Sequence, residues 1–190
     1  LPVSWARRCV YETGTALFHR LVRARYKVHG IDIEAGWDRD RLYSDQNLLD
    51  CELPKDIDLV IHLAGKSGVR ESLNDPASYW YNNVEASRRL FDYYENTRIL
   101  YASSSSAYEP DLNPYAASKY VLEELAERYP HTLGMRFHTV YSDSCPRENM
   151  FFNKLRKGTL EYTTKHHRDF IHLNDVLDAI EILIKNTNLN

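Results

Sequence analysis

The sequence predicts an α/β protein in which a parallel β-sheet carries helices on both faces. Two observations support this fold class. Short apolar segments typical of buried strands alternate along the chain with longer segments whose apolar residues recur at helical spacing. Small or polar residues also follow several of the apolar segments directly, as is typical where parallel strands end at a ligand-binding edge.

The expected elements follow one another in strand–helix order. Strands are expected at 26–33, 58–64, 99–102 and 133–137, and helices at 14–25, 78–95, 115–128, 148–157 and 175–185. Residues 1–11 contain short apolar stretches that supply at most one further strand, and the polar segment 34–56 is expected to be a loop. Asp32, Gly65, Ser104 and His138 fall at the ends of expected strands, which places them at one edge of the sheet.

The length and composition are those of one globular domain. The chain has 190 residues, of which 43% are hydrophobic and 27% charged, and this is enough for a substantial core. The net charge is −3 and the basic residues are scattered, so neither nucleic acid nor a membrane is an expected partner. Cys9, Cys51 and Cys145 are too widely spaced for a zinc site, and we expect a reducing, cytoplasmic compartment and no bound metal.

The segment 103–119 carries the residues that indicate chemistry. Four serines, at positions 103–106, follow an apolar strand, and Tyr115 and Lys119 lie four residues apart on the next expected helix, where they share a face. A phenol titrates near pH ~10, and a fixed cation beside it stabilises the phenolate and lowers that pKa. A tyrosine and a lysine at this spacing also occur on ordinary helix faces, but the serines favour a site for proton transfer to or from a substrate hydroxyl.

Six segments in a fixed order carry a resemblance to a known family, namely 26–32, 58–70, 101–108, 114–119, 134–141 and 168–175. The chain resembles the extended short-chain dehydrogenase/reductases of the NAD-dependent epimerase/dehydratase family, and in particular the UDP-glucuronate and UDP-glucose 4-epimerases. The resemblance implies a Rossmann-like, doubly wound parallel sheet as a single domain over residues 1–190, with a remnant of the substrate lobe at about 142–172. It also implies NAD as the cofactor, a nucleotide sugar as the substrate, and transient oxidation at the sugar C4.

The resemblance further implies roles for individual residues. Ser104, Tyr115 and Lys119 match the catalytic serine, the acid/base tyrosine and the lysine that also contacts the nicotinamide ribose. Besides Tyr115 and Lys119, the matches to cofactor-binding positions are Gly14, Asp32, Asn47, Leu48, Leu63, Ala64, Gly65 and His138. The matches to positions near the substrate are Lys66, Ser67, Arg70, Ser105, Thr139, Arg147 and Arg168. A carboxylate at position 32 fits NAD, because it would repel the 2′-phosphate of NADP.

The dinucleotide-binding turn is the main departure from the family pattern. That turn uses three glycines, and when the pattern is aligned on Gly14, its first and third positions are Tyr11 and Leu17. A tyrosine is poorly suited to a tight turn that must approach a pyrophosphate closely. The alignment therefore predicts weaker support for the cofactor here than relatives provide.

Other departures leave three functions open. The segment from Ser104 to Tyr115 is shorter than in relatives, and few residues follow the helix at 175–185. Ser105 and Ser106 stand where 4,6-dehydratases carry an acidic pair, which argues against a dehydratase. The leading hypothesis is a nucleotide-sugar epimerase; the alternatives are an NAD(P)-dependent sugar or keto reductase, and a catalytically idle relative that serves as a nucleotide-binding or partner-binding module.

The resemblance also implies a homodimer. Extended members of the family commonly dimerise through two helices that form a four-helix bundle, and these correspond to 78–95 and 115–128. The first of them carries Asn83, which matches an asparagine with a structural role. The apolar side chains available either for such an interface or for the core are Leu90, Phe91, Tyr94, Leu122 and Leu125.

Overall fold

A six-stranded, all-parallel sheet forms the centre of the molecule, with the strand order β3-β2-β1-β4-β5-β6. The computed structural model describes residues 2–4, 11–33, 43–143, 151–161, 165, 167, 169–186 and 188. The strands are β1 (Pro2–Ser4), β2 (His29–Asp32), β3 (Tyr43–Asp45), β4 (Leu59–His62), β5 (Arg98–Ser104) and β6 (Thr132–Phe137). This order is that of a doubly wound dinucleotide-binding sheet, whose ligands bind beyond the carboxyl ends of the strands, where the order reverses. The predicted fold class is confirmed.

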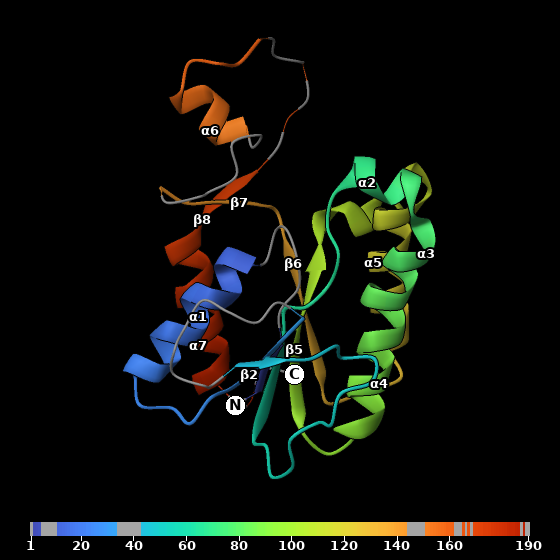
Figure 1. Cartoon of the computed structure of the whole chain (residues 1–190), viewed down its shortest axis with the longest axis vertical. Coiled ribbons are helices and arrows are strands. Elements are labelled where there is room, and N and C mark those ends of the chain that lie inside the picture. Colours follow the sequence, from blue (N-terminus) through green and yellow to red (C-terminus); the bar gives the residue numbers. More distant parts are fainter. Residues whose placement is uncertain are drawn as a thin grey trace.

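Helices cover both faces of the sheet (Figure 1). On one face lie α1 (Tyr11–Arg23) and α7 (Leu173–Lys185), and on the other lie α2 (Val69–Asn74), α3 (Pro76–Trp80), α4 (Ala86–Tyr93) and α5 (Pro114–Ala126). A π-helical turn, Tyr81–Glu85, joins α3 to α4, so the helix expected at 78–95 contains a bulge. Two 3₁₀ helices, Ser105–Tyr108 and Pro110–Leu112, connect β5 to α5.

The central strands divide their side chains between two cores. Ile61 of β4 and Leu100 of β5 pack with the helices α1 and α7, whereas their neighbours Val60 and Tyr101 pack on the opposite side of the sheet. Successive residues of a strand point to opposite faces, so a strand that is buried on both faces requires a continuous apolar run. This is why the runs in the sequence predicted these two strands correctly.

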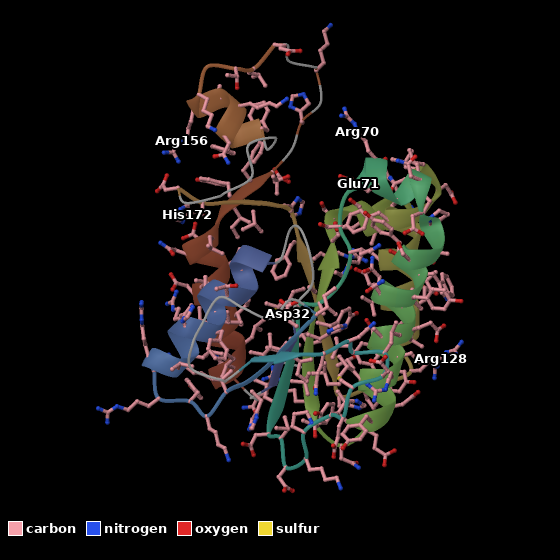
Figure 2. All side chains as sticks on the ribbon, viewed as in Figure 1. Asp32, Arg70, Glu71, Arg128, Arg156 and His172 are labelled. Atoms are coloured by element: carbon pink, nitrogen blue, oxygen red, sulfur yellow. The ribbon has the colours of Figure 1, made fainter. Side chains whose placement is uncertain are left out.

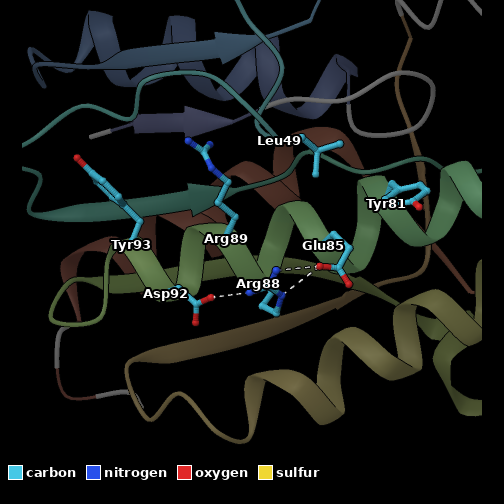
Figure 3. A pocket seen from close by; sticks show the side chains of 7 residues that line it. All are labelled: Leu49, Tyr81, Glu85, Arg88, Arg89, Asp92 and Tyr93. Atoms are coloured by element: carbon cyan, nitrogen blue, oxygen red, sulfur yellow. Dashed lines mark hydrogen bonds and ion pairs between the residues drawn. The ribbon is translucent and has the colours of Figure 1, made fainter.

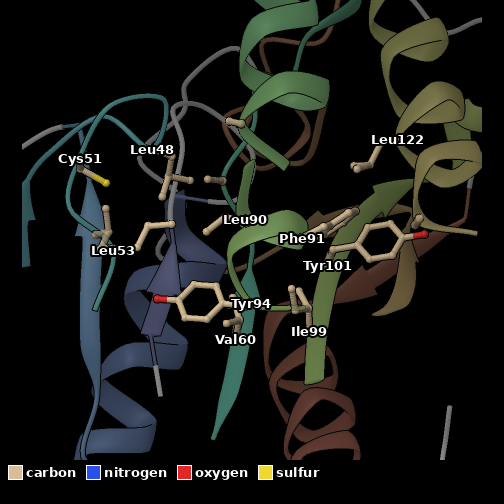
Figure 4. Packing of buried hydrophobic residues seen from close by; sticks show 14 residues of the cluster. Leu48, Cys51, Leu53, Val60, Leu90, Phe91, Tyr94, Ile99, Tyr101 and Leu122 are labelled. Atoms are coloured by element: carbon tan, nitrogen blue, oxygen red, sulfur yellow. The ribbon is translucent and has the colours of Figure 1, made fainter. Parts of the chain in front are cut away.

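Four of the five apolar residues that were available for a dimer interface belong to the second of these cores, shown in Figure 4; they are Leu90, Phe91, Tyr94 and Leu122. Leu125 is partly buried and packs against the same core. The structure therefore shows the core role for this set. Any dimer through these helices has to use their outer faces instead.

The sequence analysis missed one strand of the main sheet, and it also missed the two short strands at 139–141 and 170–172. The segment 34–56 was expected to be a loop, but β3 lies within it and pairs with β2 at the edge of the sheet. Its three residues, Tyr43–Asp45, are too few to show a periodic pattern. The prediction of an uninterrupted loop at 34–56 was wrong at this point.

A smaller unit follows the main sheet. It consists of the two-stranded parallel sheet formed by β7 (Thr139–Tyr141) and β8 (Phe170–His172), together with α6 (Phe151–Arg156) (Figure 1). Aromatic rings hold it together, since Tyr141 stacks on Phe152 with a centroid distance of 4.1 Å, and Phe152 meets Phe170 edge to face. Because β7 follows β6 almost directly, this unit begins at the carboxyl edge of the main sheet.

Candidate active site

A cavity of about 250 Å³ lies at the carboxyl edge of the sheet, beyond the ends of β4, β5 and β6. Its walls are formed by residues 65–68, 102–106 and 137–140, by two side chains of α5, and by Thr13 of α1. The sequence-predicted site residues that line it are Gly65, Lys66, Ser67, Ser104, Ser105, Tyr115, Lys119, His138 and Thr139. The structure thus brings together nine predicted residues from four separate segments of the chain.

The start of α5 positions Tyr115. Asn113 caps the helix, because its Oδ1 accepts a hydrogen bond of 2.9 Å from the backbone N–H of Ala116, and Pro114 occupies the first helical position. Tyr115 consequently lies in the first turn, where its ring packs edge to face against the ring of Tyr79 with a centroid distance of 6.1 Å. This contact fixes the direction of the phenol from one side of the cavity.

Lys119 lies one turn further along the same helix and is almost fully buried. Its Nζ donates a hydrogen bond of 2.8 Å to the backbone carbonyl of Ala102 in β5. Burial lowers the pKa of Lys119 to about 8, and the nearby carboxylate of Glu123 limits the fall. Near neutral pH the side chain therefore remains mainly a cation, held in a cavity that Tyr115 also lines.

Ser104 is the last residue of β5 and stands opposite α5 in the cavity. Its Oγ accepts a hydrogen bond of 3.1 Å from the backbone N–H of Ser106 and so caps the following 3₁₀ helix. A capping serine keeps its own O–H proton available for a second partner, since a hydroxyl both donates and accepts. The strand end thereby presents a hydroxyl at a fixed position.

The loop after β4 is tightly constrained. Gly65 has a φ of +156°, and a Cβ at this position would lie 2.8 Å from Oδ1 of Asn83 and 3.2 Å from Nζ of Lys119. A glycine is therefore needed for the loop to pass between these two side chains. Tyr79 holds the next residues, because its phenol donates to the carbonyls of Ser67 and Gly68, both at 2.9 Å.

Two polar side chains of this loop face the cavity. The Oγ of Ser67 is buried and has no hydrogen-bond partner among the described residues. Lys66 donates from Nζ to Ser78 at 2.6 Å and forms an ion pair with Asp75 at 3.5 Å. Two lysines line the cavity, and no carboxylate is among its described lining residues, which favours a ligand that carries negative charge or many oxygen atoms.

Other predicted cofactor residues lie outside the lining of this cavity. Asp32 is buried at the carboxyl end of β2 (Figure 2). Asn47 accepts a hydrogen bond of 3.0 Å from the backbone N–H of Leu49 and stabilises a turn. Three more predicted residues, Leu48, Leu63 and Ala64, are buried in the two cores.

The remaining predicted residues are also away from the cavity. Arg70 is exposed on α2 (Figure 2). Gly14 is buried in the first turn of α1. Leu17, one turn later, is a core residue. Arg147 and Arg168, like residues 5–10 between β1 and α1, lie outside the described residues.

A larger cavity, of about 550 Å³, lies on α4 and is lined by Leu49, Tyr81, Glu85, Arg88, Arg89, Asp92 and Tyr93 (Figure 3). Its charged groups are paired with one another: Arg88 forms ion pairs with Glu85 at 3.0 Å and with Asp92 at 2.9 Å. Arg89 donates to the backbone carbonyl of Leu48. None of its lining residues directly follows the carboxyl end of β4, β5 or β6, so we place the candidate active site in the smaller cavity.

Several site residues were not predicted. Thr13, Phe137 and Val140 line the cavity, and Tyr79 supports it from behind. Ser103 and Ser106, which belong to the serine run after β5, also line the cavity, and Asn83 supports the loop after β4. Tyr79 gave no local signal, since its contact with Tyr115 joins positions far apart in the chain. Among the described residues, no cluster of three or more His, Cys, Asp or Glu could hold a metal ion, and no described helix is long and apolar enough to cross a membrane.

Comparison of the sequence with known proteins finds relatives that match over about two thirds of this chain. An uncharacterized protein of Methanocaldococcus jannaschii, MJ1055, is 31% identical over 160 residues, which are 69% of this chain and 49% of that protein. UDP-glucuronate 4-epimerase 4 of Arabidopsis thaliana is 28% identical over 151 residues, 62% of this chain and 34% of the plant enzyme. The chain therefore spans half or less of the length of these relatives.

Solved structures are similar over the whole chain. MoeE5 in complex with UDP-glucuronic acid and NAD is 28% identical, with a TM-score of 0.79, and the match covers 100% of this chain and 73% of MoeE5. The UDP-glucuronic acid 4-epimerase of Bacillus cereus, at 23% identity and a TM-score of 0.80, supports the same fold, with 99% and 74% covered. Residues 13–190 match the NAD dependent epimerase/dehydratase family. The chain accordingly belongs to this family.

Proposed function

We propose that this chain carries the NAD-binding part of a nucleotide-sugar 4-epimerase, with Ser104, Tyr115 and Lys119 as its catalytic residues. The observation that carries the proposal is their meeting in one cavity at the carboxyl edge of a doubly wound sheet. No fold requirement explains a buried lysine, a tyrosine and a strand-end serine around one small space. The UDP-glucuronic acid and NAD bound by MoeE5 support the ligand classes.

The cavity fits an NAD-dependent reaction in three respects. Asp32 lies at the end of β2, where the adenosine ribose of NAD would bind, Gly65 keeps the end of β4 free of a side chain, and the buried hydroxyl of Ser67 lacks a partner among the described residues. Further residues that would hold NAD are Gly14, Asn47, Leu48, Leu63, Ala64 and His138, together with Tyr115 and Lys119. The cofactor, when bound, supplies a hydride acceptor that later returns the hydride to the sugar.

The residues of the chain would handle the proton. Tyr115, as phenolate, takes the proton from the C4 hydroxyl of the sugar, and Ser104 donates a hydrogen bond to the same oxygen. The Lys119 cation stabilises the phenolate through the field in a cavity of low dielectric. When the proton returns, Tyr115 acts as the acid. Lys66, Ser67, Ser105 and Thr139 would hold the sugar. Arg70, Arg147 and Arg168 would contact the phosphates.

The proposal is tested with Tyr115→Phe. We expect the rate of C4 epimerisation of UDP-glucuronate or UDP-glucose to fall by about 10²–10⁴-fold, because the general acid/base is lost. The matched control is Tyr120→Phe, which removes an exposed phenol from the same helix and should leave the rate unchanged. Both variants should unfold at the wild-type temperature. A fully active Tyr115→Phe protein would refute the assignment.

Two alternatives make different predictions. A sugar or keto reductase of the same fold would convert added NAD into a stoichiometric amount of NADH with substrate, whereas an epimerase returns the hydride in each cycle. A catalytically idle binding module is favoured by the altered dinucleotide-binding turn, where Tyr11 and Leu17 stand at glycine positions. Such a module would bind UDP-glucuronate or NAD in calorimetry but leave the sugar unchanged over days.

A homodimer through α3–α4 and α5 is part of the proposal. The apolar side chains exposed on these helices are Trp80, Tyr81, Tyr93 and Tyr120, and they are the ones that a four-helix bundle would cover. Light scattering at high protein concentration should give twice the monomer mass. Trp80→Glu, on the outer face, should restore the monomer without loss of fold.

A further inference from the structure

Glu123 connects three elements around the cavity without lining it. It lies on α5 one turn after Lys119, and its carboxylate bonds to Ser103 of β5 and accepts two hydrogen bonds from Arg136 of β6, at 2.8 and 2.6 Å. Ser103 and Arg136 are register partners on neighbouring parallel strands, so the carboxylate bridges adjacent positions of the sheet. Arg136 in turn lies over the ring of Tyr108, at 4.3 Å from its centroid.

Both Glu123 and Ser103 lie close in the chain to proposed catalytic residues. Ser103 immediately precedes Ser104, and Glu123 follows Lys119 by four residues. The carboxylate of Glu123 therefore connects β5, which ends at the proposed catalytic serine, to α5, which carries the proposed tyrosine and lysine. The Glu123 side chain is 16% exposed, so water screens its charge only in part. The contact between Glu123 and Ser103 therefore links β5 and α5, which both line the cavity.

We propose that Glu123 is a positioning residue of this active site: its carboxylate holds β5 against α5 and keeps Lys119 charged. The part of this role that concerns turnover rests on the proposed function, whereas the effect on Lys119 is a property of the protein alone. Glu123 is not a catalytic residue in this assignment, because it touches no lining group except Ser103.

The electrostatics of the surrounding elements agree with this role. The titratable groups that face Lys119 are His62 from β4 and, on its own helix, Tyr115 and Glu123, while β5 contributes the uncharged carbonyl of Ala102. Burial pushes the pKa of Lys119 down, and Glu123 alone among these groups supplies the opposing negative charge near neutral pH. Burial also disfavours ionisation of Glu123, but hydrogen bonds from Arg136 and Ser103 outweigh it and place its pKa below the ordinary value. The carboxylate is thus ionised wherever Lys119 titrates.

The test is a direct titration of Lys119. The whole chain is labelled with ¹³C-lysine, and the Cε resonance of Lys119, assigned with Lys119→Arg, is followed against pH in wild type, Glu123→Gln and Glu124→Gln. We expect the pKa of Lys119 to fall in Glu123→Gln, because the negative charge one helical turn away has been removed. Glu124→Gln is the matched control, since it neutralises the adjacent exposed position of the same helix and should leave that pKa unchanged.

A second variant covers the case in which Glu123→Gln does not fold. Glu123→Met combined with Arg136→Met removes both members of the pair and leaves no unpaired guanidinium, which makes it the better tolerated change. The same fall in the pKa of Lys119 is expected. An unchanged pKa in a folded variant, within about 0.3 units of wild type, would overturn the proposal.

Turnover supplies the second readout and separates this inference from the proposed function. If the epimerase assignment is right, the alkaline limb of kcat against pH should move to lower pH in Glu123→Gln, with KM within about twofold of wild type. A fall in the pKa of Lys119 together with a wild-type protein that epimerises no nucleotide sugar would refute the proposed function and leave the role of Glu123 toward Lys119 standing. An alkaline limb that stays in place while the wild type turns over would overturn the positioning role.

Discussion

The side-chain amide of Asn83 forms two hydrogen bonds with the backbone of Lys66, although the two residues belong to different elements. Oδ1 accepts from the backbone N–H of Lys66 at 2.6 Å, and Nδ2 donates to its carbonyl at 3.0 Å. Nδ2 also donates to Oγ of Ser118 on α5 at 2.8 Å. Asn83 lies in the π-helical turn, and such bulges frequently occur where a helix must present a side chain to a functional site. A single amide thus joins the loop after β4 to the π-helical turn and to α5, which lie on the same face of the sheet.

Asn83→Ala should therefore lower the free energy of unfolding by about 2–3 kcal/mol, because it removes a buried amide and leaves partly buried backbone groups of Lys66 without this partner. Urea unfolding measures the change. Asn82→Ala is the matched control: that side chain donates only to the carbonyl of Ser78 from a less buried site, and its loss should cost under about 1 kcal/mol. Equal effects of the two substitutions would contradict the special role of Asn83.

Gly134→Ala should destabilise the protein for a different reason. Gly134 is the register partner of Tyr101 on the neighbouring strand, and a Cβ at this position would lie 2.6 Å from the phenol oxygen and 2.7 Å from the adjoining ring carbon. The tyrosine is buried and has no room to move away, so we expect a loss of about 1–3 kcal/mol in urea unfolding. Tyr101→Leu combined with Gly134→Ala should cost less than the sum of the single changes, since the clash is then absent. Full additivity would count against the clash.

Lys119→Met should stabilise the protein near neutral pH. Burial lowers the pKa of Lys119 from 10.5 to about 8, so the unfolded chain holds this proton more tightly than the native protein does. At about 1.4 kcal/mol per pKa unit the penalty is roughly 3 kcal/mol below pH 8, and it disappears as the pH rises from about 8 to 10.5. Loss of the hydrogen bond to Ala102 offsets about 1 kcal/mol of the gain. Thermal unfolding at pH 7 should therefore favour Lys119→Met by about 1–2 kcal/mol, and the advantage should vanish above pH 10.5.

The central strands β4 and β5 could be predicted from the sequence, whereas the residues that support the cavity from behind could not. The runs that form β4 and β5 are apolar because both faces of each strand are buried, and this leaves a clear pattern. The pairing of Tyr115 and Lys119 followed from helical spacing alone, and the structure places both in the cavity. Local patterns do not reveal contacts such as that between Tyr79 and Tyr115, because these depend on how distant segments pack.

The bridge formed by Glu123 illustrates the same limit. Neither Ser103 nor Arg136 has a spacing to Glu123 that predicts contact, and only the register of β5 against β6 brings the two strand residues together beneath the helix. The π-helical turn was also invisible in the sequence, since its residues have the composition of an ordinary helix. Chemistry-bearing residues were thus easier to predict than the residues that hold them.

His62 should make the protein sensitive to mild acid. The imidazole is buried at the end of β4, where Nε2 shares a hydrogen bond of 2.8 Å with Oγ of Ser87 and Nδ1 has no partner among the described residues. Burial, with a smaller contribution from the Lys119 cation, lowers its pKa from 6.5 to about 3. Below pH 6.5 the unfolded chain therefore binds a proton at His62 that the native protein does not bind. The free energy of unfolding falls as the pH decreases toward 3.

His62→Gln isolates this contribution, because glutamine keeps a hydrogen-bonding group toward Ser87 but does not titrate. Free energies of unfolding are measured in urea from pH 8 to pH 4 for both proteins. The difference between wild type and variant should be constant above pH 6.5 and should then shift in favour of the variant by up to about 1.4 kcal/mol per pH unit. Carboxylates that titrate in the same range affect both proteins alike and cancel in this difference. Parallel curves down to pH 4 would mean that His62 gains its proton without unfolding, and that its burial is less complete than the structure shows.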